Sequence, residues 1–410
     1  MTPALLLRAG HHGGLGIARS LGRMGVPVYV ADSARWEPAY CSRYCRGRFA
    51  VDIENGDAVG RVLAVGRRLG RQTPGGRPLL IPTTDTAAIW TAEHAAALQE
   101  EFRFPFVDAA LVHTLCDKGR MRKLAMRSGV PTAQSVVPRR RQDLDHFVEA
   151  SGLPVIVKAT DAVRLRRQAG GTKFIVETRE ELLDFYDKAD PRQPGFLVQE
   201  FIPGEDWMFD GYFNRDSECL FGVTGKKIRR FPVNTGVTSL GVCMHNETVH
   251  RTTTEFMKTI GYRGILDIGY RYDRRDGRYK VLDVNPRIGC TFRLFAATNG
   301  LDVARALYQD MTGQPVGVAP VHQGRRWIVE DFDLFSALRS LLDGTLSVKE
   351  WAKSLRGIHE TACFAADDPL PFLLMGAADC CEVWRWMRFR REARASQSRE
   401  CGDPSLELGA

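Results

Sequence analysis

Two strand-like runs meet at a turn late in this chain: Gly264-Ile-Leu-Asp-Ile-Gly-Tyr-Arg-Tyr-Asp273 before the turn, Asp276-Gly277 within it, and Tyr279-Lys-Val-Leu-Asp-Val-Asn-Pro-Arg287 after it. Apolar and aromatic residues bounded by turn residues are typical of β-strands. Asp-Gly between two such runs is a strong signal for a tight hairpin turn. The sequence therefore predicts an antiparallel hairpin here.

The second strand of this hairpin carries several polar groups on one face. Successive side chains of a strand point to opposite faces, so Asp283, Asn285 and Arg287 are expected to point the same way and the residues between them to enter a core. Pairing the two strands is expected to bring Asp267 beside Asp283. Acidic, amide and guanidinium groups would then converge.

This set of groups suits a metal ion and a phosphate. Mg²⁺ takes one or two protein carboxylates and fills its other positions with water and phosphate oxygens. We therefore expect Asp267, Asp283 and Asn285 to bind Mg²⁺, or Mn²⁺ in its place, and Arg287 to meet a phosphate through its planar fork. The alternative is a solvated hairpin, but that leaves Asp-x-Asn-Pro-Arg without a reason, since Asp and Asn are poor strand formers.

Composition bounds the class of protein. The chain has 410 residues, enough for two or three domains, and its charged (26%) and apolar (44%) fractions are those of a globular protein. The formal net charge of +8 fits an anionic substrate. Nucleic acid is not expected as a partner, because neither an aromatic-basic repeat nor a helix-turn-helix signature is present.

Cysteine spacing and hydropathy indicate which metal sites and which cellular location to expect. The ten cysteines lack the spacing and histidine partners of a zinc site. No apolar run approaches bilayer length, and the N-terminal apolar run is too short for a signal peptide. We therefore expect a cytoplasmic protein without stable membrane insertion.

The chain divides into successive α/β regions. A strand at 5–7, a helix at 14–25 and a strand at 28–31 open a parallel layer. Three Gly-x-Pro sequences mark helix ends before extended segments, at Gly25, Gly129 and Gly152. The expected domains are 1–105, 106–315 with subdomains of about 106–190 and 191–315, a helical region at 316–395, and a disordered tail at 396–410.

Several motifs occur in a characteristic order over residues 1 to 315. They are Asp117-Lys118, Pro154-Val-Ile-Val-Lys158, Val198-Gln-Glu-Phe-Ile-Pro-Gly-Glu205, Asp267 and Asp283-x-Asn-Pro-Arg287. In order and spacing these motifs resemble the ATP-grasp superfamily. Leu5-Leu-Leu-Arg-Ala-Gly-His-His12, Ser42-Arg-Tyr44 and Lys227-x-Arg-x-x-Pro232 look most like its predicted carboxylate-amine ligases, the branch related to D-aspartate ligase.

The resemblance implies a fold and an activity. The fold would be a Rossmann-like pre-ATP-grasp α/β domain, then an α+β ATP-grasp domain and a mostly helical C-terminal region. The activity would be an ATP-dependent carboxylate-amine, or carboxylate-thiol, ligase that makes an acylphosphate and releases ADP and phosphate. Its partners would be a small-molecule acid and an amine, and a homodimer is left open.

The same resemblance suggests roles for individual residues. ATP would be held by Lys118, Lys158, Gly170, Gly171, Glu200, Phe201, Ile202 and Glu205. Gly170 and Gly171 would belong to a lid, residues 200–202 would read adenine through their backbone, and Glu205 or Asp206 would hold the ribose. Lys158 and Arg287 would act on the transferring phosphoryl group, while Lys227 and Arg229 would meet the acidic substrate. Arg229 and Arg230 could instead be a solvated loop pair. Asp267, Asp283 and Asn285 would bind two Mg²⁺ ions, and both acidic ligands are Asp, where the family often has Glu.

Other interpretations compete with this one. Gly10, Gly13 and Gly16 follow the first strand as in nucleotide-binding oxidoreductases, but position 12 lacks the glycine of the dinucleotide fingerprint. A non-catalytic module with the grasp fold is the other alternative. Glu200 could be an edge-strand charge, and His11 and His12 could be structural. The arginine-rich segment 384–391 could lie on an anionic membrane, although a terminal helix packed on the core is preferred.

Overall fold

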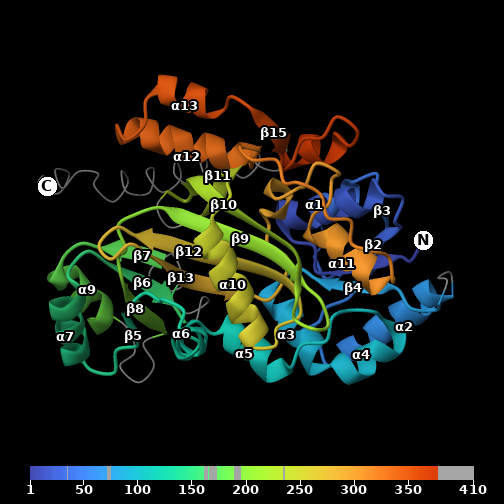
Figure 1. Cartoon of the computed structure of the whole chain (residues 1–410), viewed down its shortest axis with the longest axis horizontal. Helices are drawn as coiled ribbons and strands as arrows, with labels where there is room; N and C mark the ends of the chain where they lie inside the picture. The colour runs from blue at the N-terminus through green and yellow to red at the C-terminus, as the bar shows by residue number, and fades with distance from the viewer. Residues whose placement is uncertain are drawn as a thin grey trace, which may run out of the picture.

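The computed structural model describes residues 1–34, 36–71, 75–160, 165, 173–188, 195–233 and 236–376. The predicted lid with Gly170 and Gly171, the arginine-rich segment 384–391 and the predicted tail lie outside the described residues. The described chain forms three sheets with helices around them (Figure 1).

The N-terminal region is a parallel sheet covered by helices. Its strands run in the order β3-β2-β1-β4 and are β1 (Ala4–Leu7), β2 (Val28–Asp32), β3 (Cys45–Ala50) and β4 (Leu79–Pro82). The helices are α1 (His11–Gly22), η1 (Pro38–Cys41), α2 (Ala58–Gly70), α3 (Asp85–Glu93) and α4 (Ala95–Glu101). All four residues of β1 are buried, as expected for a strand covered on both faces. The predicted parallel opening is confirmed.

A small antiparallel sheet follows. Its strands run in the order β5-β8-β6-β7 and are β5 (Ser135–Val136), β6 (Val155–Ala159), β7 (Lys173–Val176) and β8 (Phe196–Glu200). The helices of this region are α5 (Ala109–Cys116), α6 (Lys118–Arg127), α7 (Arg141–Ser151) and α9 (Arg179–Asp187). Side chains of α7 and α9 bury one face of this sheet.

The third sheet is the largest and crosses the middle of the molecule. Its order is β13-β12-β9-β10-β11-β14-β15, antiparallel except for β14 and β15. The strands are β9 (Asp206–Phe213), β10 (Cys219–Phe231), β11 (Val237–Cys243), β12 (Gly264–Asp273), β13 (Arg278–Asn285), β14 (Arg326–Ile328) and β15 (Ile358–Thr361). The helices are α10 (Glu247–Thr259), η2 (Phe292–Leu294), α11 (Val303–Met311), α12 (Glu330–Leu342) and α13 (Val348–Ser354).

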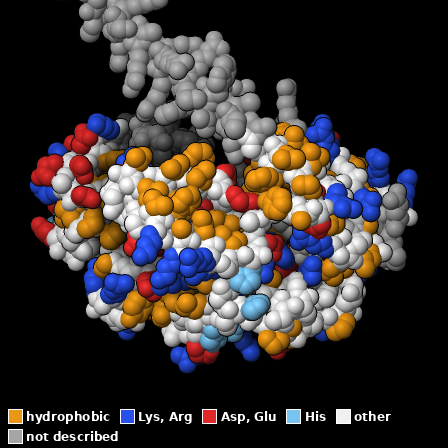
Figure 2. Space-filling model, turned by 90° about the horizontal axis from the view of Figure 1, so that it is seen from above, with side chains coloured by type: hydrophobic (Ala, Val, Ile, Leu, Met, Phe, Trp, Pro, Cys, Tyr) orange, Lys and Arg blue, Asp and Glu red, His pale blue; other side chains and the backbone are white. Residues whose placement is uncertain are grey.

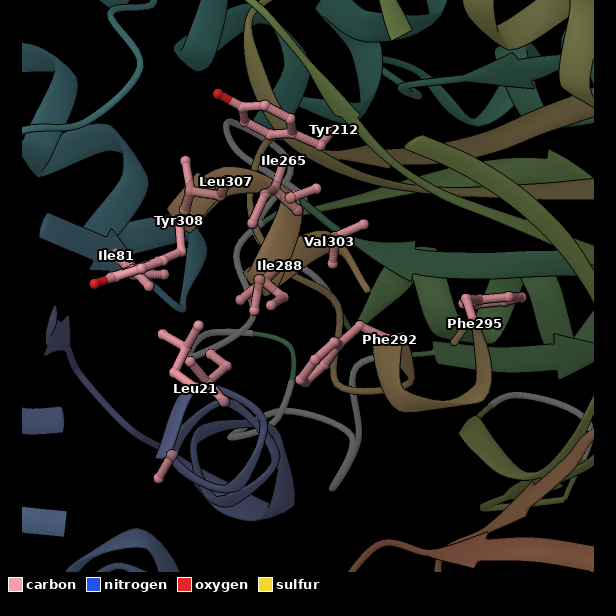
Figure 3. Close-up of a cluster of buried hydrophobic side chains, with 14 of the residues drawn as sticks. Leu21, Ile81, Tyr212, Ile265, Ile288, Phe292, Phe295, Val303, Leu307 and Tyr308 are labelled. Carbon is pink, nitrogen blue, oxygen red and sulfur yellow. The ribbon is translucent and has the colours of Figure 1, made fainter. Parts of the chain in front are cut away.

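The two faces of the large sheet pack against different parts of the chain. One face, with Phe209 and Ile268, packs on α10 and on α5 and α6. The opposite face, with Tyr212 and Ile265, packs against the N-terminal sheet and α11 in a continuous apolar cluster (Figure 3). Two residues farther along the same strands and the same face, the side chains become polar. That polar part is the candidate site.

The C-terminal region contains strands as well as helices. Residues 316–376 supply β14 and β15 to the large sheet, and α12 and α13 lie above it (Figure 1). Seen from above, the molecule shows patches of apolar side chains on this side (Figure 2). Leu338 and Leu342 of α12 are exposed. The mostly helical character and the domain limits given above stay predictions. Within the described ranges no helix is long and apolar enough to cross a membrane.

Glycines end helices where the sequence predicts. Gly25, Gly129 and Gly152 have φ of 81°, 75° and 73°, the left-handed conformation that residues with a Cβ avoid. Gly277 in the predicted hairpin turn also has a positive φ, 69°. The turn thus lies where Asp-Gly places it.

Candidate functional site

The predicted hairpin is β12 paired with β13, but its register differs from the expectation. Asp267 lies opposite Asn285, and Asp283 lies opposite Gly269, so Asp267 and Asp283 are diagonal neighbours. The pairing skips Leu282, which forms a bulge between Val281 and Asp283. This bulge puts Val281 as well as Val284 in the core and leaves Asp283 on the polar face.

Gly269 makes room for the Asp283 carboxylate. A Cβ at position 269 would lie 2.5 Å from Asp283 Oδ1, closer than any real contact allows. Gly289 has the same relation to Asp267, with 2.6 Å from its Cβ position to Oδ2. Both glycines therefore let the chain approach the acids closely.

A row of polar side chains crosses three neighbouring strands. Asp210 on β9, Asp267 on β12 and Asn285 on β13 lie side by side in register. Asn285 Nδ2 donates to Asp267 Oδ2 at 3.2 Å. Burial raises the pKa of Asp267, and the charge of Arg287 opposes this shift. Burial, followed by the charge of Asp267, raises the pKa of Asp210 well above its usual range.

Arg287 links this row to the N-terminal region. Its Nε donates to Asp85 Oδ1 at 2.8 Å, and its Nη1 lies 3.5 Å from Asp267 Oδ2. Asp85 begins α3, directly after the N-cap residue Thr84. The predicted phosphate-binding guanidinium is thus held between two carboxylates at the boundary between two sheets.

Lysines from two sheets surround Asp283. Lys158 and Lys173 are cross-strand partners on β6 and β7. Neighbouring protein atoms oppose the ionisation of Asp283, although its side chain is exposed to solvent, and Lys227, Lys158, Lys173 and Lys118 together hold its pKa below the usual value. Lys118 Nζ also donates to the carbonyl of Ala159 at 3.2 Å. The predicted cations and the predicted acid therefore lie in one electrostatic cluster.

The positions of Lys158 and Lys173 disfavour the charged forms of both lysines. Burial and, after it, the charge of Lys173 lower the pKa of Lys158 to about 7. Burial also lowers the pKa of Lys173 to about 8, against the opposing charge of Asp283. Among the described residues, neither lysine forms an ion pair with a carboxylate. Like charges opposite each other on paired strands destabilise a sheet, so this place favours an anion.

The predicted adenine segment, residues 200–202, has a defined environment. Glu200 is 3% exposed and lies on β8, an interior strand, so the edge-strand alternative is wrong. Its Oε1 accepts from the backbone N of Gln134 at 2.8 Å, and its carboxylate pairs with Arg275 and Lys280. The Glu200 side chain is therefore occupied, and its backbone N donates to the carbonyl of Gln134 at 3.0 Å.

Neighbouring groups also engage the rest of that segment. The carbonyl of Ile202 accepts from Arg271 Nε. The Arg271 guanidinium lies 5.3 Å from the centroid of the Phe201 ring. Arg271 thus joins the segment to β12.

A polar cavity of about 350 Å³ lies between the start of β9, the end of β10 and α12. Its lining includes the predicted residues Glu205, Lys227 and Arg229. Glu205 Oε1 lies 2.6 Å from Lys226 Nζ, and Asp206 is 3.1 Å from Arg230 and from Arg271. Glu205 and Asp206, the two candidate ribose ligands, therefore line the same cavity.

Arg229 has a structural partner. Its guanidinium forms a bidentate ion pair with Asp333 of α12, at 2.8 and 2.9 Å, and its Nη1 donates to Ser354 Oγ at 2.7 Å. Because Asp333 already takes up this charge, we no longer assign Arg229 to the acidic substrate. Lys227 lines the polar cavity, its charge acts on Asp283, and its role toward an acidic substrate stays a prediction.

His12, which the sequence placed on the loop after β1, lies instead in the first turn of α1. Its ring centroid is 5.6 Å from that of Trp327 and 5.9 Å from that of Phe332, and the residue is 6% exposed. This environment supports the structural interpretation of His12. The side chain of His11 lies outside the described residues.

The sequence interpretation missed three residues of this region: Asp85, Lys173 and Asp210. Asp210 is an acid within the apolar run Trp207–Phe213, a signal that the sequence did contain. Lys173 becomes significant only through its pairing with Lys158. Asp85 meets Arg287 across 202 residues of sequence, a contact that no local pattern reveals.

Comparisons with known proteins agree with this architecture. No protein-family model matches the chain. D-aspartate ligase from Enterococcus faecium is 29% identical over 247 residues, which cover 57% of this chain and 58% of that protein. The chain thus spans less than two thirds of that relative's length.

Solved structures share the fold. N5-carboxyaminoimidazole synthetase from Staphylococcus aureus, complexed with ADP, has a TM-score of 0.60 at 12% identity and covers 79% of this chain and 80% of its own. L-amino acid ligase from Bacillus licheniformis has a TM-score of 0.55 at 17% identity, with coverage of 75% and 74%. The solved structures show the fold that these enzymes share, and the sequence relatives, D-aspartate ligase among them, point together with the ordered motifs to the ATP-grasp superfamily of carboxylate-amine ligases.

Proposed function

We propose that this protein is an ATP-dependent ligase that activates a substrate carboxylate as an acylphosphate, joins it to an amine, and releases ADP and phosphate. The names of the relatives support this class, since D-aspartate ligase and L-amino acid ligase are among them. A carboxylate reacts poorly with an amine until one of its oxygens becomes a phosphate leaving group. A site that gathers cations around an anionic reaction serves that step.

The lysine cluster carries the proposal. Lys118, Lys158, Lys173 and Lys227 come from α6, β6, β7 and β10 and act together on Asp283. A triphosphate fits this excess of positive charge, since it would relieve the repulsion between Lys158 and Lys173. In this arrangement the lysines bind and orient the phosphates, and Lys158 and Arg287 act on the phosphoryl group in transfer.

The acids fit a divalent cation. Asp267, Asp283 and Asn285 offer two carboxylates and an amide oxygen, the partial ligand set that Mg²⁺ shares with phosphates and water. In the described parts of the chain, no three His, Cys, Asp or Glu side chains are placed to hold a metal by themselves. This agrees with a metal that arrives with a nucleotide. Bound there, Mg²⁺ would neutralise phosphate charge during transfer.

The rest of the site has complementary tasks. The backbone of residues 200–202 would hold adenine, and Glu205 or Asp206 would hold the ribose beside the polar cavity. Arg271 positions this segment through the Ile202 carbonyl. A small-molecule acid and amine would enter near Asp267 and Arg287, where the N-terminal region approaches the large sheet.

The deciding experiment measures the nucleotide product. The purified protein is given Mg²⁺, ATP and a panel of amino acids and small carboxylates in pairs, and nucleotides and products are identified by mass. We expect ADP, phosphate and a condensed product in equal amounts. AMP with pyrophosphate would overturn the acylphosphate route, and nucleotide binding without any turnover would support the non-catalytic alternative.

A further inference from the structure

A cavity of about 60 Å³ lies where the N-terminal region meets the large sheet. Its walls come from β4 and α3, from the start of β12, and from α11. The segment 104–107, which lies between α4 and α5, and the residues that follow β13 complete the lining. The proposed function assigns no ligand to this cavity.

Most of the lining is apolar and buried. The side chains of this part include Leu80, Ile81, Phe104, Ile265, Ile288 and Leu307. Four of them are labelled in the apolar cluster of Figure 3. Half-buried residues, among them Ala92, Pro105 and Val107, form the rim. The cavity is therefore an apolar pocket that opens at this rim.

Two hydrogen-bond donors on the walls lack acceptors. Thr91 of α3 is 4% exposed, and its Oγ1 forms no hydrogen bond with the described residues. The Nε of Arg263 is also buried, and within the described part of the chain it has no acceptor. A buried donor left without a partner is costly. The fold therefore leaves two donors available to a ligand.

The charge of Arg263 is not compensated either, because no ion pair joins it to a carboxylate of the described residues. Arg287, the other cation of the lining, donates to Asp85 at 2.8 Å and lies 3.5 Å from Asp267. A guanidinium binds a carboxylate strongly through its planar fork. Arg263 is thus the group with which this cavity can attract an anion.

The volume of the cavity limits the size of its ligand. One water molecule needs about 10–15 Å³, so the cavity takes roughly four to six atoms of that size. A cavity that binds benzene is larger, about 150 Å³. A branched alkyl group of about four carbons fits instead, and its burial contributes to binding.

We propose that this cavity binds a short branched aliphatic carboxylate that is not a substrate of the proposed ligase. The alkyl group fills the apolar part, the carboxylate accepts from Arg263, and the Thr91 hydroxyl donates to it from α3. Apolar pockets with a few polar groups, placed between domains, are typical ligand sites.

The position of the cavity separates its ligand from the reaction. None of the lysines or acids of the candidate site lines the cavity, so a carboxylate bound here is not placed for phosphoryl transfer. It would contact Pro286 and Ile288, on either side of Arg287. Binding requires no nucleotide, and the inference therefore does not depend on the proposed function.

The test measures binding of isovalerate to the full chain without nucleotide, by saturation-transfer nuclear magnetic resonance. We expect a dissociation constant of about 1 mM, an affinity that ligands of this size reach. Acetate, which lacks the branched alkyl group, should bind at least about 10-fold more weakly. Absence of isovalerate binding at about 20 mM would overturn the inference.

Two substitutions test the two parts of the site. Arg263→Gln removes the charge and should weaken isovalerate binding by at least about 10-fold, since hydrogen bonds to charged groups are strong. Ala88→Leu fills the apolar part and should weaken binding to a similar extent. If Ala88→Leu fails to fold, Ala92→Leu takes its place. Unchanged binding in the filling variant would mean that isovalerate binds elsewhere, which overturns the inference.

Matched controls carry the same substitutions at exposed positions. Arg251→Gln on α10 and Ala96→Leu on α4 should leave the isovalerate affinity within about 2-fold of the wild type. A loss in these controls equal to that in Arg263→Gln and Ala88→Leu would contradict the assignment to the cavity.

A second measurement separates this ligand from the substrate. With Mg²⁺, ATP and a panel of amino acids present, isovalerate should be recovered unchanged. Its conversion into a condensed product would overturn the inference and support the ligase proposal. Isovalerate binding by a protein that turns over ATP with no pair of substrates would leave the inference standing and count against the ligase proposal.

Discussion

Two clusters of charged side chains in this molecule differ in whether their charges are paired. Around Arg293 every charge has a partner: its guanidinium meets Asp302 and both carboxylate oxygens of Glu360, which also pairs with Arg325. Around Lys158 the buried charges repel each other, and Asp210 has no hydrogen-bond partner among the described residues. The first cluster fastens β15 to η2 and α11, whereas the second leaves its charges for a ligand.

The difference separates structural from functional charge. Arg293 and Asp302 are buried and fully paired, so burial itself does not mark a site. Burial without compensation does, because the fold then bears a cost that only a bound partner removes. Arg229 shows the value of this distinction: it looked like a substrate residue in sequence, yet it pairs with Asp333.

The largest effect should come from the acid at the centre of the lysine cluster. Asp283→Asn removes one charge without changing size, and we expect turnover to fall by at least about 10³-fold, as loss of metal-assisted charge stabilisation is worth several kcal/mol. Asp276→Asn, in the hairpin turn, is the matched control and should keep activity. Wild-type turnover in Asp283→Asn at saturating Mg²⁺ would show that the hairpin acids are structural only.

Stability should respond in opposite ways in the two clusters. Arg293→Met leaves Asp302 and Glu360 short of a partner and should cost about 3–5 kcal/mol in the free energy of unfolding. Lys158→Met removes an uncompensated buried charge, so the unfolding free energy should stay equal or increase. Urea denaturation of the ligand-free proteins measures both. A marked loss of stability in Lys158→Met would mean that this lysine has a structural partner.

The lowered pKa of Lys158 determines whether stability rises or falls with pH. Lys158 has a pKa of about 7 in the folded protein and about 10.4 when unfolded. Between these values the unfolded chain binds more protons, so stability of the ligand-free protein should rise with pH, by up to about 1.4 kcal/mol per pH unit for one group.

Lys158→Met tests the origin of that slope. Lys173, with a pKa of about 8, adds a smaller contribution of the same sign. Urea unfolding at pH 7, 8 and 9 should therefore show a shallower increase in the variant. An identical slope in wild type and variant would contradict the assignment.

Much of this arrangement could be predicted from the sequence. The hairpin follows from Asp-Gly and the flanking strands, and the cation and acid motifs follow from their order along the chain. Their relative placement could not be predicted in detail, because the bulge at Leu282 changes which residue faces Asp267. A one-residue shift of register exchanges the faces of a strand, and nothing local in the sequence marks this one.

Contacts between residues that are distant in sequence could not be predicted either. Asp85 and Arg287, or Arg229 and Asp333, meet only because the sheets bring them together. Local patterns give the chemical type of a side chain and its face. They do not tell whether its charge is already paired, which is what separates the two clusters.

The smallest effect should come from the space beside Asp283. A Cβ at Gly269 would lie 2.5 Å from Asp283 Oδ1, so Gly269→Ala must displace that carboxylate by a fraction of an ångström. The lysines and their charges stay unchanged, and we expect the Mg²⁺ concentration for half-maximal turnover to rise by roughly 3- to 10-fold, about 0.7–1.4 kcal/mol. Gly56→Ala, whose Cβ would meet nothing within 4 Å, is the control for the substitution itself. A change in nucleotide affinity without a change in the Mg²⁺ requirement would contradict this prediction. It would mean that Asp283 positions the lysines that bind phosphate, and that the metal ion binds elsewhere.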